Sequence, residues 1–325
     1  MRVVAELPTA AELKSFLPIS MELAACKAQR DAELASVLRG DSDKFLVVVG
    51  PCSADDPAAV VEYAAELAQI AKDAPQIHVI MRVFTAKPRT TTTGYMGLIH
   101  DMGVEAARRL HLDVLAASGG VLSTADELLY PALYPYFSDI VSYFTIGARS
   151  SENQEHRLVA SGINAAVAVK NPLSGDVSAM VNAVFAIKQP QDFIFCGNLV
   201  NSGGNLLAHG ILRGCDMPNY HITNLLEIDD MFSKIGINSP ALIIDTNHGN
   251  SGKNHAKQPE IAHNVMQMRQ NHPKIRRLVR GLMIESYIKE GCQNSHGAAY
   301  GRSVTDPCLS LADTADLIYT ISSQI

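Results

Sequence analysis

The sequence predicts an α/β fold, a (β/α)8 TIM barrel with an N-terminal helical extension and a short inserted β-hairpin. Short apolar runs rich in Val, Ile and Leu alternate with helical patterns, which is typical of βαβ units and a parallel sheet. Several runs end at a reactive side chain, and barrels build their active sites at such C-terminal strand ends. The length of 325 residues, 47% of them hydrophobic, suits one large domain of this kind.

The apolar runs are bounded by Gly, Pro or Asn, as expected for buried parallel strands. Seven of them lead to a chemically distinctive residue: 45–49 to Cys52, 78–81 to Arg82, 146–148 to Arg149, 165–169 to Lys170, 211–212 to Arg213, 241–245 to His248 and 282–284 to Glu285. Seven such ends predict one shared mouth that holds a thiol, a histidine, a carboxylate and several cations.

The remaining elements follow from the same patterns. Residues 1–44 precede the first strand and have the pattern of amphipathic helices, so we assign 1–44 to the extension and 45–325 to the barrel domain. The extension is expected to cap the barrel bottom or to contact another subunit. One further strand is expected at 121–124, and the strand that leads to Arg149 is expected to span 140–148. Helices are expected at 60–70, 104–116, 151–161, 177–187, 222–232 and 260–270.

One strand pattern is surplus to an eight-stranded barrel. Residues 193–196 precede a Gly- and Asn-rich stretch, and 211–213 follow with no room for a helix between them. We expect residues 193–204 to form a hairpin inserted before the sixth barrel strand. The alternative is an open, doubly wound sheet.

Composition narrows the range of partners. The net charge of -6 argues against nucleic-acid and membrane-surface partners, and no apolar stretch reaches the roughly 18 residues of a membrane span. The six cysteines are far apart, form no CxxC pair and follow no recognisable signal peptide, which predicts reduced thiols in the cytoplasm. Cations at strand ends of an acidic chain indicate a small anionic substrate.

One group of candidate residues offers metal ligands. Cys52, His248 and Glu285 come from strand ends and Asp306 from a polar loop near the C-terminus, and one S, one N and two O ligands suit a divalent transition metal. Other roles are open: an inert buried thiol for Cys52, a structural hydrogen bond for His248, and an N-cap for Asp306 before the apolar helix at 309–318.

A second group is cationic, and its members are Arg82, Lys87, Arg89, Arg149, Lys170 and Arg213. Arg149, Lys170 and Arg213 close three consecutive strands, so they can converge on one anion. Burying such cations is costly unless acidic side chains or a ligand neutralise them, and the scarcity of acids at the strand ends favours a ligand.

The loop 87–94 is a third feature. Lys87, Pro88 and Arg89 are followed by four threonines and Gly94. Hydroxyl and amide groups in such a loop can bind a second phosphate, although a Thr-rich surface turn would have the same composition.

These residues lie in motifs that closely resemble class I 3-deoxy-D-arabino-heptulosonate 7-phosphate (DAHP) synthase. The motifs occur in the family's order from about residue 12 to the end of the chain. They are Gly50-Pro51-Cys52-Ser53, Met81-Arg82-Val83, Lys87-Pro88-Arg89-Thr90-Thr91, Ile146-Gly147-Ala148-Arg149, Ile211-Leu212-Arg213-Gly214, Met283-Ile284-Glu285-Ser286 and Tyr300-Gly301-Arg302-Ser303-Val304-Thr305-Asp306.

The resemblance implies a metal-dependent transferase of the shikimate pathway. It would condense phosphoenolpyruvate (PEP) with erythrose 4-phosphate and water, giving DAHP and phosphate. One divalent ion, with Mn, Fe, Co and Zn equally open, would be held by Cys52, His248, Glu285 and Asp306. The ion would polarise the aldehyde carbonyl.

The resemblance also implies substrate-binding roles. PEP would lie among Arg82, Arg149, Lys170 and Arg213. Lys87 would lie beside the reacting carbons and is expected to be catalytic, together with Cys52 and His248. Arg89 and Thr90 would hold the phosphate of the aldehyde. Glu127 falls at an active-site glutamate of the family, although its surroundings differ.

Four loops depart from the family pattern. The chain is shorter after Asp101, carries an additional Thr after Arg89, has a rewritten segment at 197–209, and reads Asn247-His248-Gly249 where Ser-His-Ala is usual. Such loops touch the acceptor side, the subunit interface and the inhibitor site in the family. Two other hypotheses therefore stay open: a PEP-dependent paralogue with a different aldehyde, and a non-catalytic relative.

We further expect a homo-oligomer, either a dimer or a tetramer. The short hairpin at 193–204 predicts weak or no inhibition by aromatic amino acids.

Overall fold

The computed structural model describes residues 2–91, 93–294 and 298–325. Thr92, one of the threonines of the loop at 87–94, lies outside the described residues.

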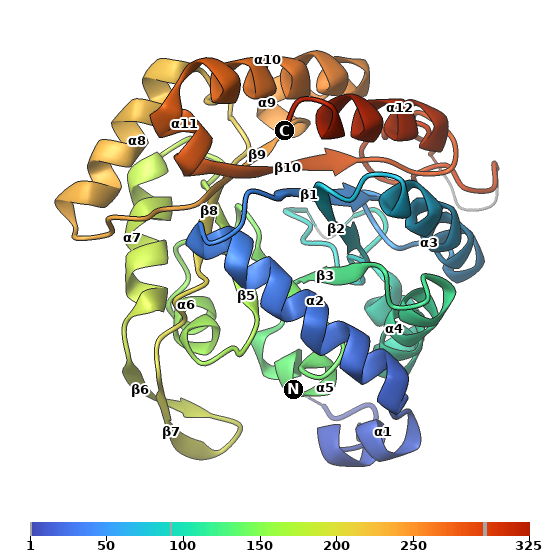
Figure 1. Ribbon diagram of the computed structural model, residues 1–325. Coiled ribbons are helices and arrows are strands. Elements are labelled where there is room, and N and C mark those ends of the chain that lie inside the picture. Colours follow the sequence, from blue (N-terminus) through green and yellow to red (C-terminus); the bar gives the residue numbers. More distant parts are fainter. Residues whose placement is uncertain (1, 92, 295–297) are drawn as a thin grey trace.

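Parallel strands form a closed barrel in the order β1-β10-β9-β8-β5-β4-β3-β2 (Figure 1). Because β1 pairs with both β2 and β10, the open, doubly wound alternative is wrong. The strands are β1 (Phe45–Gly50), β2 (Ile77–Arg82), β3 (Ser123–Glu127), β4 (Tyr143–Ile146), β5 (Ala166–Lys170), β8 (His209–Leu212), β9 (Leu242–Asp245) and β10 (Val279–Glu285).

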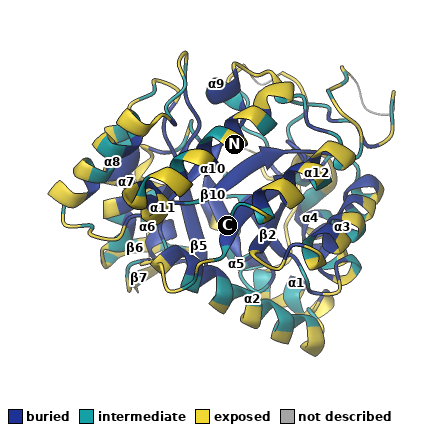
Figure 2. Cartoon of the chain, turned by 45° about the horizontal axis from the view of Figure 1, so that its top comes forward, coloured by how far each residue is buried: buried dark blue, intermediate teal, exposed yellow. Residues whose placement is uncertain are grey.

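Helices surround the barrel and expose their outer faces, whereas the strands are buried (Figure 2). They are α3 (Pro57–Lys72), α4 (Leu98–Ala117), α5 (Tyr134–Phe137), α6 (Gln154–Ser161), α7 (Val177–Lys188), α8 (Ile222–Lys234), α9 (His248–Ser251), α10 (Gln258–Asn271), α11 (Pro273–Leu278) and α12 (Leu311–Ser322), with 3-10 turns at Pro131–Leu133 and His255–Lys257. None of the described helices is long and apolar enough to cross a membrane.

Several element boundaries differ from the prediction; for example, α4 begins at Leu98 rather than at residue 104, and β4 spans Tyr143–Ile146 rather than 140–148. Helix α6 begins at Gln154 rather than residue 151, because the side chain of Asn153 caps it. The third strand begins at Ser123 rather than at residue 121, because Ser123 is the first of its residues to pair with β2. Helix α12 is capped by Ser310, so Asp306 is not its N-cap.

The N-terminal extension contains α1 (Ala10–Phe16) and α2 (Met21–Arg39). Helix α2 closes the barrel at the end where the strands begin. Its apolar residues Leu34, Val37 and Leu38 join the core inside the barrel. Glu33 on the same helix accepts a hydrogen bond from Nδ1 of His78 at 2.8 Å, and Nε2 of His78 lies 3.0 Å from the hydroxyl of Ser123. Helix α2 thus covers the bottom of the barrel, which is one of the two roles expected for the extension.

The predicted hairpin is present and begins two residues earlier than expected. Strands β6 (Gln191–Phe195) and β7 (Asn198–Ser202) pair with each other and with no barrel strand. Cys196 and Gly197 form the turn, and both have positive φ angles (47° and 77°), as two-residue hairpin loops require.

Candidate active site

The C-terminal ends of the barrel strands surround a cavity of about 240 Å³. More cations than acids line it, so the cavity suits an anion. The lining residues are Cys52, Arg82, Phe84, Lys87, Pro88, Arg89, Glu127, Gly147, Ala148, Arg149, Lys170, Leu173, Arg213, His248, Lys253, Glu285, Thr305 and Asp306. The lining residues other than the four predicted metal ligands include all the strand-end cations.

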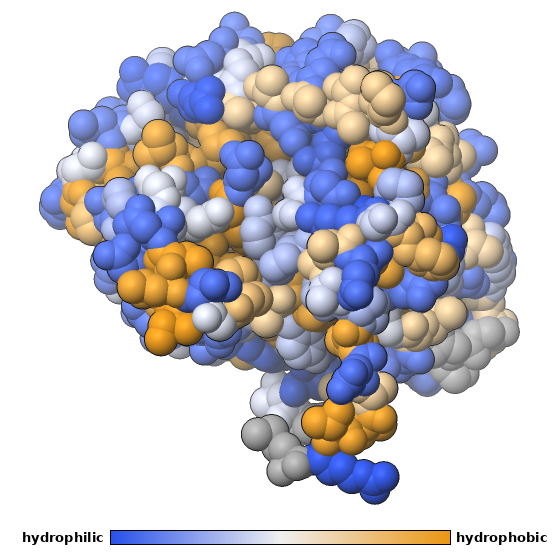
Figure 3. All heavy atoms as spheres, turned by 90° about the horizontal axis from the view of Figure 1, so that it is seen from below, coloured by the Kyte–Doolittle hydropathy of each residue, from blue (hydrophilic) through white to orange (hydrophobic). Residues whose placement is uncertain are grey.

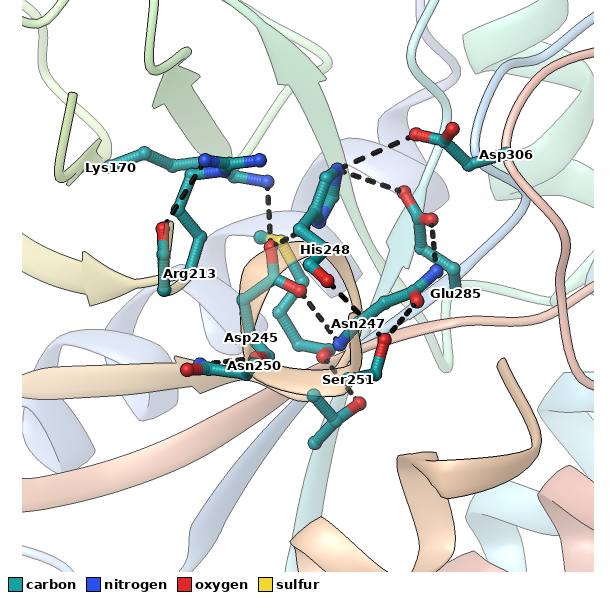
Figure 4. A network of polar contacts seen from close by, with 12 residues as sticks. Lys170, Arg213, Asp245, Asn247, His248, Asn250, Ser251, Glu285 and Asp306 are labelled. Atoms are coloured by element: carbon teal, nitrogen blue, oxygen red, sulfur yellow. Dashed lines mark hydrogen bonds and ion pairs between the residues drawn. The ribbon is translucent and has the colours of Figure 1, made fainter. Parts of the chain in front are cut away.

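Four predicted metal ligands converge at one side of the mouth. The ligand atoms of Cys52, Glu285 and Asp306 lie within 4.8 Å of one another. Nε2 of His248 is 3.8 Å from both Oε1 of Glu285 and Oδ2 of Asp306, and dashed lines mark these two contacts in Figure 4. The Cys52 thiol is 3.9 Å from Oδ2 of Asp306.

The barrel holds these ligands through buried hydrogen bonds. Asn247 donates to Oε2 of Glu285 at 2.7 Å, and Gln258 bonds both the N–H and the C=O of Glu285. Nδ1 of His248 lies 2.9 Å from Oδ2 of Asp245, which leaves Nε2 facing the other ligands. A carboxylate behind the ligating imidazole is a common arrangement at metal sites, because it fixes the ring and its tautomer.

This group of residues fits a divalent transition ion. Ligand atoms that surround an ion at about 2.0–2.3 Å stand roughly 3–4 Å apart, close to the separations seen between His248, Glu285 and Asp306. Burial opposes the charged form of Glu285, but His248 and Arg82 outweigh it and hold its pKa at about 2. Burial raises the pKa of the Cys52 thiol, as do Glu285 and Asp306, so thiolate ligation needs a cation nearby.

Two cations of the mouth are neutralised by acids. Arg82 is buried and donates to Oε1 of Glu285 at 2.9 Å, and Lys170 donates to Oδ2 of Asp245 at 2.9 Å. The expectation that these cations lack acidic partners is wrong for this pair, because the sequence does not show that β2 and β10 both flank β1 or that β5 and β9 both flank β8. Nη1 of Arg82 nevertheless has no hydrogen-bond partner among the described residues.

Arg213 is buried without an acidic partner in the part of the chain that the structure describes, and asparagines fix its backbone. Oδ1 of Asn171 accepts from the Arg213 N–H at 2.9 Å, and Asn219 donates to the same oxygen. Gly214 follows with φ 68°, and a side chain there would overlap the backbone of Asn250. Neighbouring β4, β5 and β8 thus carry Arg149, Lys170 and Arg213 to one side, as predicted.

Lys87 connects the cation group to the metal-ligand group. Its ammonium donates to the carbonyl of Cys52 at 2.6 Å and lies 3.3 Å from the Cys52 sulfur. The ring of Phe84 lies beneath Arg82, 4.2 Å from its guanidinium carbon. Burial acts to lower the pKa of Lys87, but Cys52, Glu285 and Glu127 raise it above its ordinary value. Lys87 is therefore held as a charged acid next to the cavity.

The loop after Lys87 contributes to the outer part of the mouth. Arg89 lines the cavity and donates to the carbonyl of Tyr95 at 2.8 Å. Thr90 accepts a hydrogen bond from Nε of the exposed Arg149 at 3.0 Å. Thr90 itself is not among the cavity-lining residues, so the structure brings it to the rim through Arg149.

Glu127 ends β3 and projects into the mouth. Its Oε1 is buried and has no hydrogen-bond partner among the described residues. Any side chain at Gly147 would overlap this oxygen, so Gly147 makes room for it. Burial raises the pKa of Glu127, although Lys87 and Lys170 counteract it. One oxygen of this half-buried side chain is thus enclosed near two lysines and unpaired within the described part of the chain.

Some site residues escaped the prediction. Asp245 joins Lys170 to His248, and Asn247 orients Glu285. Asp245 had a signal, since it is an acid at the end of a fully apolar strand and three residues before His248. Lys253 at the rim lies 4.0 Å from Asp306 but is mostly exposed, and no pattern marked it.

Comparison with known proteins agrees with this geometry. Residues 19–318 match the family model described as the DAHP synthetase I family. The chain belongs to the DAHP synthetase I family.

Relatives in this family align over nearly their full length. The phospho-2-dehydro-3-deoxyheptonate aldolase of Corynebacterium glutamicum is 34% identical over 353 residues, covering 100% of this chain and 93% of the relative. The Tyr-sensitive enzyme of Escherichia coli K12 is 34% identical over 340 residues, covering 98% and 93%. The solved structure of the aldolase from Francisella tularensis SCHU S4 has a TM-score of 0.92 and 32% identity, covering 100% of this chain and 98% of that chain.

Proposed function

We propose that the chain is a DAHP synthase, which condenses PEP with erythrose 4-phosphate and water and releases phosphate, the first step of aromatic amino acid biosynthesis. The observation that carries the proposal is the meeting of four metal-binding side chains and a cluster of cations in one barrel mouth. Membership of the DAHP synthetase I family supports it, and the matched relatives give no support to a paralogue with a different acceptor.

Cys52, His248, Glu285 and Asp306 are the proposed ligands of one divalent metal ion. Their mixed S, N and O donors accept several transition ions. When bound, such an ion supplies Lewis-acid polarisation of the aldehyde carbonyl. Asn247 and Asp245 would orient two of the ligands from behind.

The cations are the proposed PEP site. Arg82 offers a buried, unpartnered Nη1, and Arg213 has no acidic partner among the described residues. Arg149 and Lys170 stand on the neighbouring strands. Guanidinium groups bind phosphate and carboxylate oxygens bidentately, so this group can fix both ends of PEP and aim its C3 at the aldehyde carbon.

Lys87 is the proposed proton donor. As C3 of PEP bonds to the aldehyde carbon, the aldehyde oxygen gains an electron pair and takes a proton. The Lys87 ammonium is charged, buried and held by the carbonyl of Cys52, so it can supply that proton. Water then adds at C2 and phosphate leaves. Arg89 and Thr90 would bind the phosphate of the aldehyde.

We also propose self-association through the lower face, which is the surface that carries the N-terminal tail, α1, α2 and the hairpin. Viewed from below, Figure 3 shows apolar clusters and a projecting N-terminal tail. The strongly exposed apolar side chains of the tail, α1, α2 and the hairpin are Val3, Val4, Leu7, Phe16, Met21, Ile194 and Leu199. Apolar surface of this kind is typical of an interface, and a second copy of the chain is the proposed occupant.

The six free thiols suit the reducing cytoplasm as the proposed compartment.

A phosphate-release assay tests the function. With PEP and a divalent metal, erythrose 4-phosphate should give the highest kcat/KM within a panel of aldoses and aldose phosphates, and a chelator should abolish release. Higher kcat/KM with another aldehyde would replace the proposed acceptor. No release with any aldehyde, despite metal and PEP binding, would refute the enzyme proposal.

A further inference from the structure

Three buried polar side chains meet behind the active-site mouth, outside the roles assigned above. Asp126 precedes Glu127 on β3, so its side chain points away from the mouth and toward α4. There it meets His111 of α4 and Thr85, which follows β2. The exposed fractions of Asp126, His111 and Thr85 are 4%, 0% and 1%.

Every acceptor position of the Asp126 carboxylate is used. Oδ1 accepts from the backbone N–H of Thr85 at 2.9 Å and of Glu127 at 2.7 Å. Oδ2 accepts from the Thr85 hydroxyl at 2.6 Å and lies 3.1 Å from Nε2 of His111. Because a carboxylate can only accept, Nε2 of His111 carries the proton. The His111 ring also packs edge-on against Phe137, with the centroids 5.8 Å apart.

These bonds join two segments that carry proposed active-site groups. Thr85 begins the loop that leads to Lys87, and its carbonyl accepts from Ile99 at the start of α4. Glu127 is the residue that projects into the mouth. One carboxylate therefore ties the base of the Lys87 loop to the end of β3, and His111 anchors that carboxylate to the helix behind it.

We propose that Asp126 and His111 are positioning residues that hold Lys87 and Glu127 in place for the reaction. The inference rests on the proposed function, because turnover is its main readout. Displacing a reacting group by about 1 Å can cost about 10²-fold in rate, so a loosened loop base should be visible in kcat. Arg149, Lys170 and Arg213 stand on other strands, so PEP binding should be spared.

The test compares truncating with conservative variants. His111→Leu and Asp126→Ala should each lower kcat at least about tenfold, with KM for PEP within about threefold of the wild-type value. His111→Gln can still donate to Asp126. Asp126→Asn can still accept from both backbone amides while Thr85 and His111 reverse their roles. Both conservative variants should keep kcat within about threefold.

Val114→Ala is the matched control, since it removes buried volume from the same helix without touching the polar cluster. It should lower the melting temperature and leave kcat unchanged. The proposal is overturned if the two truncations keep wild-type kcat, if KM for PEP rises in step with the loss of kcat, or if the conservative variants are no better than the truncations.

Two further measurements keep the outcome decisive. If the truncated proteins do not fold, Thr85→Val, which loses only the hydroxyl, should lower kcat at least about threefold at constant KM for PEP, and an unchanged kcat overturns the proposal. If the wild-type chain releases no phosphate, the proposed function fails by itself. Hydrogen exchange at residues 83–89 then decides: faster exchange in Asp126→Ala, with exchange close to the wild-type rate in Asp126→Asn, supports the proposal, and unchanged exchange in Asp126→Ala overturns it.

Discussion

Among individual residues, Lys87 stands where the cations meet the proposed metal ligands. Its ammonium contacts both the carbonyl and the sulfur of Cys52. The strand-end pattern predicted Cys52, Arg82, Lys170, Arg213, His248 and Glu285 because each is the last residue of its strand or follows within three residues of its end. Asp306 does not end a strand, and it was grouped with the other ligand candidates from its place in a polar loop near the C-terminus. The strand-end pattern missed the pairing of Lys170 with Asp245, since sequence does not show which strand ends lie close together.

Lys87→Met should lower turnover by about 10²–10⁴-fold, because the variant loses the proposed proton donor. Metal content, measured by mass spectrometry, should stay close to that of the wild type, since all four proposed ligands remain. Lys87→Arg keeps the charge but is a much weaker acid, so its turnover should also be low. Lys234→Met, at an exposed ion pair on α8, serves as the control. Near-normal turnover in Lys87→Met would remove Lys87 from the mechanism.

At the scale of elements, α2 closes the bottom of the barrel, and a hydrogen bond between His78 and Glu33 holds the helix there. Glu33 accepts from the ring of His78, whose other nitrogen faces Ser123. The hydrogen bond from His78 lowers the pKa of Glu33, and burial lowers the pKa of His78. The extension was predictable from its amphipathic pattern. The contact between the extension and His78 was not predictable, because His78 lies within an apolar strand pattern.

These pKa directions give a pH dependence of stability. A carboxyl with a lowered pKa stabilises the fold above its ordinary pKa of about 4.3 and loses this effect as the pH falls. A histidine with a lowered pKa favours the neutral ring, so stability also falls as the pH drops below about 6.5. The free energy of unfolding of the wild type should therefore decrease from pH 7 toward pH 4.

Glu33→Gln should lower the free energy of unfolding by about 1–3 kcal/mol at pH 7, because it weakens a partly buried, charge-assisted hydrogen bond. The difference from the wild type should shrink in acid, where Glu33 loses its own contribution. Urea denaturation followed by circular dichroism at several pH values measures both. Glu105→Gln, at an exposed helical ion pair, should change little. A constant difference at every pH would contradict this account of α2.

At the scale of the whole molecule, the barrel separates two ends with different surfaces. The C-terminal ends of the strands carry the charged mouth, whereas the lower end carries the hairpin, the extension and exposed apolar side chains (Figures 1 and 3). Alternating strand and helix patterns predicted this architecture well, because each barrel strand reads as a short apolar run. The hairpin boundaries were less predictable, since its strands are half exposed and their pattern is weak.

Charged substitutions in the hairpin test the lower face. Ile194→Asp with Leu199→Asp should reduce the molar mass measured by light scattering after size exclusion, because both side chains are about four-fifths exposed in the single chain. Met217→Asp, which replaces an exposed apolar residue beyond β8, is the control and should leave the mass unchanged. A wild type that is already monomeric would refute self-association.

The short hairpin also bears on regulation. Its strands span only Gln191–Phe195 and Asn198–Ser202. We expect weak or no inhibition by aromatic amino acids, measured as phosphate release with phenylalanine or tyrosine added. Strong inhibition at micromolar concentrations would contradict this expectation.

Two carboxylates in the mouth are each shared between neighbours. Glu285 faces Arg82 on one side and His248 on the other, and Asp245 does the same between Lys170 and His248. A metal ion that attracts these carboxylate oxygens would weaken their ion pairs with Arg82 and Lys170. Both side chains would then attract an anion more strongly. Metal and PEP affinities are then thermodynamically linked, and each ligand must strengthen the other by the same factor. Consequently, most occupied protein molecules would hold both the metal ion and PEP, and few would hold only one of these ligands.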